Sequence, residues 1–285
     1  MTILRVFPKR TSYTPDDPLA FVGMPPMREM IPEHDEVHVS CTFTWDMDEA
    51  EELAFQWEMA TRKPVKIGGV AYHSPSLDFI PGLYVKKGIT FTSRGCNNNC
   101  PWCGVRTVEG KLRELPVCEG NILQDNNFLQ CSRHHKEAVF DMLRKQRGIC
   151  FRGGLESDLV DDHFVENIKS LRIAELWLAC DTDGALPSFK KACKKLTGAG
   201  FDRNHIKCYS LIGKDMKKEE ARNREIYNAG AMPFSQLQRD FSRTKTQYSA
   251  EWKSFERTWQ RPAATVAHMR AVEAGGELEQ EEMIL

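Results

Sequence analysis

The first part of the chain carries two kinds of hydrophobic pattern. Residues 36–43, EVHVSCTF, alternate apolar and polar positions in the manner of a half-buried strand. Residues 46–60 carry apolar side chains at helical spacing, and Asp46 stands where a helix-capping residue is expected. Residues 64–69, PVKIGG, predict a second strand, so these segments together predict one βαβ unit. Six prolines interrupt residues 1–36, where we expect an extended arm with turns.

From residue 88 onward, short apolar strands alternate with amphipathic helices. This alternation predicts a parallel sheet or barrel, with about six βα steps instead of the eight that close a full barrel. We therefore expect an α/β fold, namely a partial (β/α)6 TIM-like barrel with a small N-terminal βαβ unit. The expected domains are 1–85 for the Pro-rich arm and reduced βαβ unit, 86–262 for the barrel, and 263–285 for an acidic C-terminal helix and tail. The predicted strands are 88–93, 120–126, 148–154, 175–181, 206–213 and 232–240, and the helices 134–146, 162–171, 186–200 and 217–230.

Composition and charge narrow the class of protein. The chain has 285 residues and is 41% apolar, as packed globular proteins are. It contains no run of about 18 uncharged apolar residues, and its N-terminus lacks the apolar core of a signal peptide. We expect a cytoplasmic protein without membrane association. A formal net charge of −1 gives no overall signature of a nucleic-acid binder.

Three of the ten cysteines lie in one run, CNNNCPWC, directly after a predicted strand. In a reducing compartment thiols persist as metal ligands, reactive groups or buried hydrophobes. Cys96, Cys100 and Cys103 could converge on one metal centre, and three thiolates leave one iron of a four-iron, four-sulfur cluster without a protein ligand. Such an iron can chelate S-adenosylmethionine and pass an electron to its sulfonium, which yields a 5′-deoxyadenosyl radical. Trp102, between the last two cysteines, could shield the cluster and lie near adenine.

This run resembles the cluster loop of the radical S-adenosylmethionine superfamily, which follows the first strand of a partial six-step barrel. The βα succession from 88 to about 240 is similar to that barrel. The resemblance implies an enzyme with a 4Fe-4S cluster and S-adenosylmethionine as cofactors, and an electron donor such as flavodoxin or ferredoxin. The segments QDNNF, FRGGLES and LIGK resemble strand ends that contact S-adenosylmethionine in the superfamily. The contacts so implied are Trp102, Asn126, Arg152, Gly153, Gly154, Glu156, Asp181, Tyr209 and Gly213; no catalytic residue is assigned.

The sequence departs from the superfamily pattern in two places. Only about twenty residues separate Cys103 from QDNNF, so the usual first helix and second strand are expected to be compressed or recast. Residues 50–69 resemble the tail of a cobalamin-binding domain, but the DxHxxG motif is absent and about 85 residues are too few for the complete domain. We therefore expect no cobalamin.

The substrate expectation rests on a looser resemblance. A compact stand-alone chain of this kind is similar to proteins of bacteriophages and mobile elements, including radical isomerases proposed for hypermodified thymidine in phage DNA. The expected substrate is a nucleoside, nucleotide or nucleic-acid base. One alternative is radical modification of a peptide or small metabolite.

A second alternative is a non-catalytic iron-sulfur or zinc-binding protein. His134 and His135 could complete a zinc site, but they open a predicted helix and are interpreted as its exposed first turn. The remaining seven cysteines are scattered, and those inside predicted strands are expected to be small buried hydrophobes. They are Cys41, Cys118, Cys131, Cys150, Cys180, Cys193 and Cys208.

Overall fold

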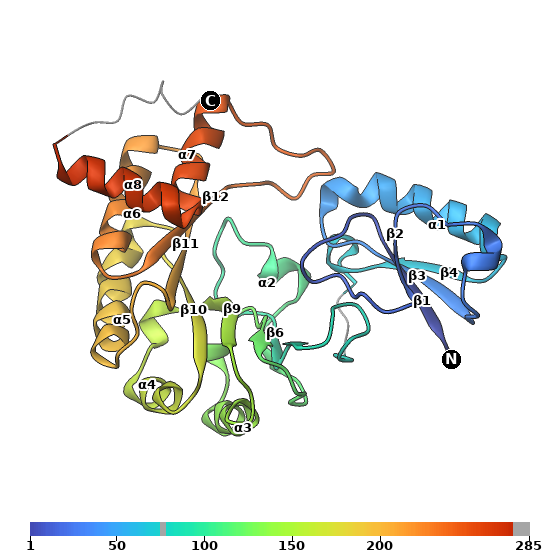
Figure 1. The fold of residues 1–285 in the computed structure, drawn as a ribbon, viewed down its shortest axis with the longest axis horizontal. Helices are drawn as coiled ribbons and strands as arrows, with labels where there is room; N and C mark the ends of the chain where they lie inside the picture. The colour runs from blue at the N-terminus through green and yellow to red at the C-terminus, as the bar shows by residue number, and fades with distance from the viewer. Residues whose placement is uncertain (75–77, 276–285) are drawn as a thin grey trace. The chain divides into compact units, whose positions relative to one another are not determined.

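The computed structural model describes residues 1–74 and 78–275 and has a mixed α/β fold with parallel sheets (Figure 1). The chain packs into two compact units. The N-terminal unit comprises Met1–Gln146 and Arg239–Thr246, and the C-terminal unit comprises Arg147–Gln238 and Gln247–Leu285. The expected domain boundaries at residues 85 and 262 concern folding domains and stay predictions. The final residues of the expected acidic tail, 276–285, lie outside the described residues.

The N-terminal unit contains eight strands and three α-helices within the described residues. They are β1 (Ile3–Phe7), β2 (Ala20–Val22), β3 (Glu36–Ser40), α1 (Met47–Thr61), β4 (Val65–Gly68), β5 (Ile89–Thr90), β6 (Ser93–Arg94), α2 (Val105–Val108), β7 (Arg113–Glu114), β8 (Ile122–Leu123) and α3 (Arg133–Leu143). Strands β1 to β4 form a parallel sheet in the order β2-β1-β3-β4. The predicted βαβ unit is therefore present as β3, α1 and β4.

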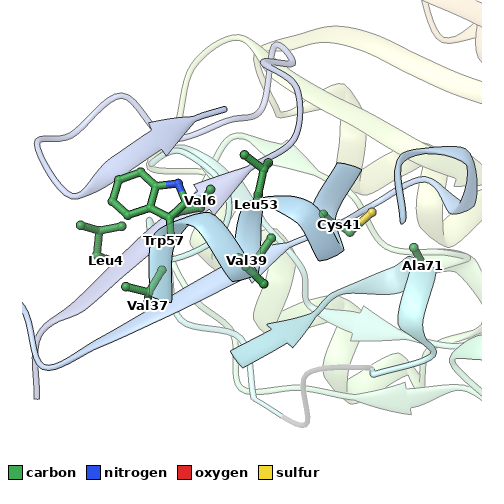
Figure 2. Packing of buried hydrophobic residues seen from close by; sticks show 10 residues of the cluster. Leu4, Val6, Val37, Val39, Cys41, Leu53, Trp57 and Ala71 are labelled. Atoms are coloured by element: carbon green, nitrogen blue, oxygen red, sulfur yellow. The ribbon is translucent and has the colours of Figure 1, made fainter. Parts of the chain in front are cut away.

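One face of this sheet is closed by α1. Figure 2 shows Leu4 and Val6 from β1 and Val39 from β3 lying against Leu53 and Trp57 of α1. All five side chains are at most 2% exposed. Their contact removes a continuous apolar surface from water, which is the main favourable contribution to the stability of this layer.

Two details of the predicted N-terminal region are wrong. Residues 1–36 are not only an extended arm, because β1 and β2 belong to the sheet and the prolines stand between the strands instead of inside them. Asp46 directly precedes α1 but makes no capping hydrogen bond. Its carboxylate pairs with Lys9 instead.

The C-terminal unit is a run of βα steps. Its elements are β9 (Ile149–Leu155), α4 (Asp162–Lys169), β10 (Ile173–Ala179), α5 (Leu186–Gly198), β11 (Ile206–Ile212), α6 (Met216–Asn228), β12 (Met232–Leu237), α7 (Ala250–Gln260) and α8 (Pro262–Glu273). Neighbouring strands from β9 to β12 pair in parallel, as the alternation of strands and helices predicts. In β11 the buried residues alternate with half-buried ones, so one face of this sheet packs into the core and the other carries Lys207 and Tyr209.

Candidate iron-sulfur site

The three cysteines of CNNNCPWC lie on an irregular loop that leaves β6 and ends at α2. Cys96 and Cys100 are half-buried and Cys103 is exposed, and none is in a disulfide. Strand β6 pairs antiparallel with β7, while β5 pairs in parallel with β8. Between β5 and β8 the chain thus forms a single turn of helix, α2, and the small antiparallel ribbon of β6 and β7.

The segment QDNNF holds the cysteine loop through three consecutive side chains. Asp125 accepts hydrogen bonds from the backbone N–H and the hydroxyl of Thr92, and Asn126 Oδ1 accepts one from the N–H of Gly95 (2.9 Å). The amide of Asn127 donates to the sulfur of Cys96 (3.8 Å). Because β5 and β8 are parallel neighbours, the residues that follow them meet at one edge of the pair. These polar side chains therefore anchor the loop to the segment that follows β8.

Backbone amides and a second side chain complete this anchoring. The Asn98 N–H donates to the Cys96 sulfur (3.4 Å). Gln130 accepts from the Asn97 N–H (2.8 Å) and donates to the side chain of Asn98 (3.1 Å). Two N–H donors therefore lie at one sulfur, and hydrogen bonds of this kind orient a metal ligand. The Asn98 backbone and the Asn127 side chain thus both direct N–H groups toward Cys96.

Gly95 is required where the loop begins. Its φ of +81° is unfavourable for other residues, and a Cβ at this position would lie 2.2 Å from the carbonyl oxygen of Lys111. The Cys96 N–H also donates to the carbonyl of Gly110 (3.2 Å). At Gly95 the cysteine loop and residues 110–111, the return segment, therefore lie too close together to leave room for a side chain.

A buried ion-pair group supports the same ribbon. The Glu109 carboxylate receives Arg94 at 3.2 Å and Arg113 at 3.1 Å. The side chain of Glu109 is 5% exposed, so its charge needs these partners. Burial lowers the pKa of Arg94, while Glu109 opposes that shift.

Burial raises the pKa of Asp125, which is 2% exposed, above the ordinary value for an aspartate, and the hydrogen bonds from Thr92 oppose this shift. The same burial effect raises the pKa of Cys131 to about 12. A buried thiol with such a pKa is neutral and unreactive at physiological pH. Cys131, which directly follows Gln130, is thus a buried and protonated thiol at neutral pH.

The residues of the loop suit a four-iron cluster in kind and number. Three thiols without disulfides stand on one loop, and N–H groups already point at one of them. Among residues 1–74 and 78–275, no group of three or more Cys, His, Asp or Glu side chains is placed to hold a single metal ion. A cluster differs from a single ion because each thiolate binds a separate iron.

Of the expected S-adenosylmethionine contacts, Trp102 and Asn126 lie in the N-terminal unit. Trp102 is half-buried in the cysteine loop, and Asn126 uses its oxygen to hold Gly95. The assignment of Asn126 to the cofactor stays a prediction. His135, expected in an exposed first turn, is buried at the start of α3, which corrects that expectation, while His134 is exposed as expected.

The other expected contacts lie in the C-terminal unit, where two of them meet. The Tyr209 hydroxyl donates to the backbone carbonyl of Arg152 (2.9 Å), and the Arg152 side chain pairs with Glu175 (2.8 Å). The rings of Tyr209 and Trp177 have centroids 4.6 Å apart. Arg152 and Tyr209 therefore share one half-buried aromatic and charged surface of the sheet.

The remaining expected contacts are held separately. Asp181 accepts a hydrogen bond from the Leu211 N–H (3.0 Å), and the Gly213 N–H donates to Glu219 (3.0 Å). Gly213 has a φ of +125° beside the Tyr248 ring. Gly153 and Gly154 lie at the end of β9, and Glu156 follows that strand.

Sequence reasoning missed several residues that shape these surfaces. Glu175 and Trp177 occupy alternate positions of β10, so strand periodicity places both on the face that carries Arg152 and Tyr209. Asn127 is recognisable only by its position after Asp125 and Asn126. Phe241, whose ring contacts Gly104 at the end of the cysteine loop, carries no local signal because it lies more than one hundred residues away.

No protein-family model matches the sequence, and a comparison with curated proteins gives no significant match. Within the described residues, no helix combines the length and apolarity needed to cross a membrane.

Proposed function

We propose that this chain is a radical S-adenosylmethionine enzyme whose 4Fe-4S cluster is held by Cys96, Cys100 and Cys103. The observation that carries the proposal is the anchored loop, in which three thiols follow a short strand and Asn98 and Asn127 direct N–H groups at Cys96. When bound, a four-iron cluster with one open iron supplies the electron for reductive cleavage of S-adenosylmethionine.

The chain's own residues would position the cluster and limit access of water to it. Gly95 lets the loop lie against the return segment, and the amides fix the sulfur of Cys96. Trp102 lies between two ligands, and Phe241 packs on Gly104, so aromatic surface borders the loop. Apolar cover of this kind lowers solvent exposure, which tunes the potential of a cluster.

The finer fold belongs to the same proposal. Strand β5 pairs in parallel with β8, and strands β9 to β12 each pair in parallel with the next strand and alternate with helices. Both patterns support a partial (β/α)6 barrel. The proposed S-adenosylmethionine contacts are those that the resemblance implies, including Arg152 and Tyr209. Ten free thiols suit a reducing compartment, so we place the enzyme in the cytoplasm with a flavodoxin or ferredoxin as electron donor.

The experiment is anaerobic reconstitution with iron and sulfide, followed by S-adenosylmethionine and a reductant. We expect about four iron per chain and formation of 5′-deoxyadenosine. Nucleosides, DNA and RNA are then compared with peptides by mass spectrometry, which separates the proposed nucleic-acid substrate from the peptide alternative. Tightly bound zinc without iron uptake would favour the non-catalytic alternative and end the proposal.

A further inference from the structure

An aromatic surface lies beside the cysteine loop in the N-terminal unit. The rings of Phe43 and Trp45 stack with centroids 4.8 Å apart and an angle of 10° between their planes. Phe43 is 40% exposed and Phe241 is 60% exposed. The Thr44 hydroxyl donates to the carbonyl of Ser242 (2.7 Å), which ties the two segments together. Single exposed aromatics are common, but a group of this kind marks a binding surface.

Two cations lie over this surface. The Arg239 guanidinium is 5.2 Å from the centroid of the Trp45 ring, and the Lys245 ammonium is 5.8 Å from it. Within the described part of the chain, Arg239 forms no salt bridge. The Arg239 guanidinium can contact a phosphate while the rings offer flat apolar area.

The carboxylates nearby are mostly engaged by other cations. Lys9 pairs with Asp46 and Glu49, and Arg243 pairs with Asp48 and Glu51. Asp240 accepts hydrogen bonds from the N–H and hydroxyl of Ser242 and is the acid that would oppose a phosphate here. The surface is therefore mainly aromatic and carries only a small positive charge.

We infer that this surface, defined by Phe43, Trp45, Arg239, Phe241 and Lys245, binds a short segment of single-stranded nucleic acid. Bases stack on the exposed faces of Phe43 and Phe241, and Arg239 and Lys245 contact the backbone phosphates. Stacking tolerates any base, so recognition by this surface is not specific for sequence. The inference rests on the proposed function, since it names the substrate class of that enzyme, and the Phe241 ring places the surface against the cysteine loop at Gly104.

The test is fluorescence anisotropy of labelled oligothymidylate and oligouridylate with the full-length protein, without reductant or S-adenosylmethionine. We expect Phe43→Ala and Phe241→Ala each to weaken binding ~5-fold to 100-fold, as loss of one stacked base does. With two cations, log affinity should fall with log salt at a slope of about −1.4, and Arg239→Gln should halve that slope.

The controls are matched in residue type. Phe55, 57% exposed on α1, and Lys253 on α7 lie outside this surface, and Phe55→Ala and Lys253→Gln should leave affinity unchanged. The inference is overturned by absent binding at low salt, by a duplex binding as tightly as a single strand, by equal competition from polyglutamate, or by an equal loss in Phe55→Ala. Protein that binds oligonucleotide but fails to cleave S-adenosylmethionine would sink the proposed function and leave this surface standing. Cleavage without binding would do the reverse.

Discussion

The cysteine loop of the N-terminal unit and the core of the C-terminal unit use the same side chain in opposite surroundings. Cys96 and Cys100 are half-buried on irregular backbone, and polar side chains of QDNNF hold the loop in place. Cys193 and Cys208 are fully buried on α5 and β11, where burial raises the pKa of both thiols. The half-buried thiols lie where a metal can reach them, and the fully buried thiols pack among apolar side chains. The surroundings of a cysteine, more than its presence, indicate its role.

The sharpest test of this contrast is removal of single thiols. Replacing Cys96, Cys100 or Cys103 with Ala should reduce reconstituted iron from about four per chain to background and abolish 5′-deoxyadenosine, because two thiolates hold a cluster poorly. Cys193→Ala and Cys208→Ala should retain both signals and lose about 1 kcal/mol of stability through small cavities. Iron and 5′-deoxyadenosine are measured on the same samples. Iron loss in either core variant would erase the distinction.

The second test separates steric fit from backbone strain at the loop. Gly95→Ala should lower the free energy of unfolding by about 3 kcal/mol and impair iron uptake, because its Cβ meets the Lys111 carbonyl. Gly110→Ala is the matched control, with a φ of +79° but nothing within 4 Å of the added Cβ. It should cost only about 1 kcal/mol. Equal effects in denaturant unfolding would show that close approach is unimportant.

The third test concerns the amide that faces the cluster ligand. Asn127→Ala removes the side-chain donor to the Cys96 sulfur, and groups that support metal ligands typically change metal retention ~10-fold. We expect reconstituted Asn127→Ala to lose iron to a chelator about tenfold faster than the unmodified protein. Asn204→Ala, at an exposed turn of the C-terminal unit, serves as the control. Identical rates in all three proteins would contradict a supporting role.

The last test concerns the pH dependence of the core. Burial raises the pKa of Cys193 from 9.0 to about 12. Below pH 9 this thiol is neutral in the folded and unfolded states, and its contribution is fully present. Between pH 9 and about 12 only the unfolded state loses the proton, so the free energy of unfolding falls as pH rises.

Cys193→Ala lacks this titration. It should be less stable than the unmodified protein near neutral pH by about 1 kcal/mol, and the gap should narrow above pH 9 by up to about 1.4 kcal/mol per pH unit. Denaturant unfolding of both proteins across this range measures the gap. A constant gap would mean that the thiol titrates normally.

Periodicity predicted the parts of the fold whose pattern is local. Strands β9 to β12 and helices α3 to α6 fall where the sequence predicts them, because strand and helix periods are visible within single segments. β1 was missed because its segment, ILRVF, is short and is followed by a proline-rich stretch. It is an inner strand because it pairs with both β2 and β3.

The candidate site, like the fold, could be predicted only where its sequence signals are local. The spacing of Cys96, Cys100 and Cys103 is a local signal, and so is the polar run after β8. Which of those polar residues faces which loop atom depends on how β5 and β8 end side by side, and the sequence does not encode that contact locally. Thr44 and Ser242 are hydrogen-bonded across nearly two hundred residues, and no sequence pattern indicates that contact.

The N-terminal unit is built from two separate stretches of sequence, and this limits how the chain could be divided into fragments. Arg239–Thr246 belongs to that unit, although the chain on both sides of it belongs to the other. A fragment that stops at Gln146 would lack Arg243, leaving Asp48 and Glu51 at the start of α1 without that partner, and would uncover Gly104. No single cut therefore releases the cysteine loop with its complete surroundings, and a fragment meant to carry the loop must be built from two pieces of sequence joined by a new linker.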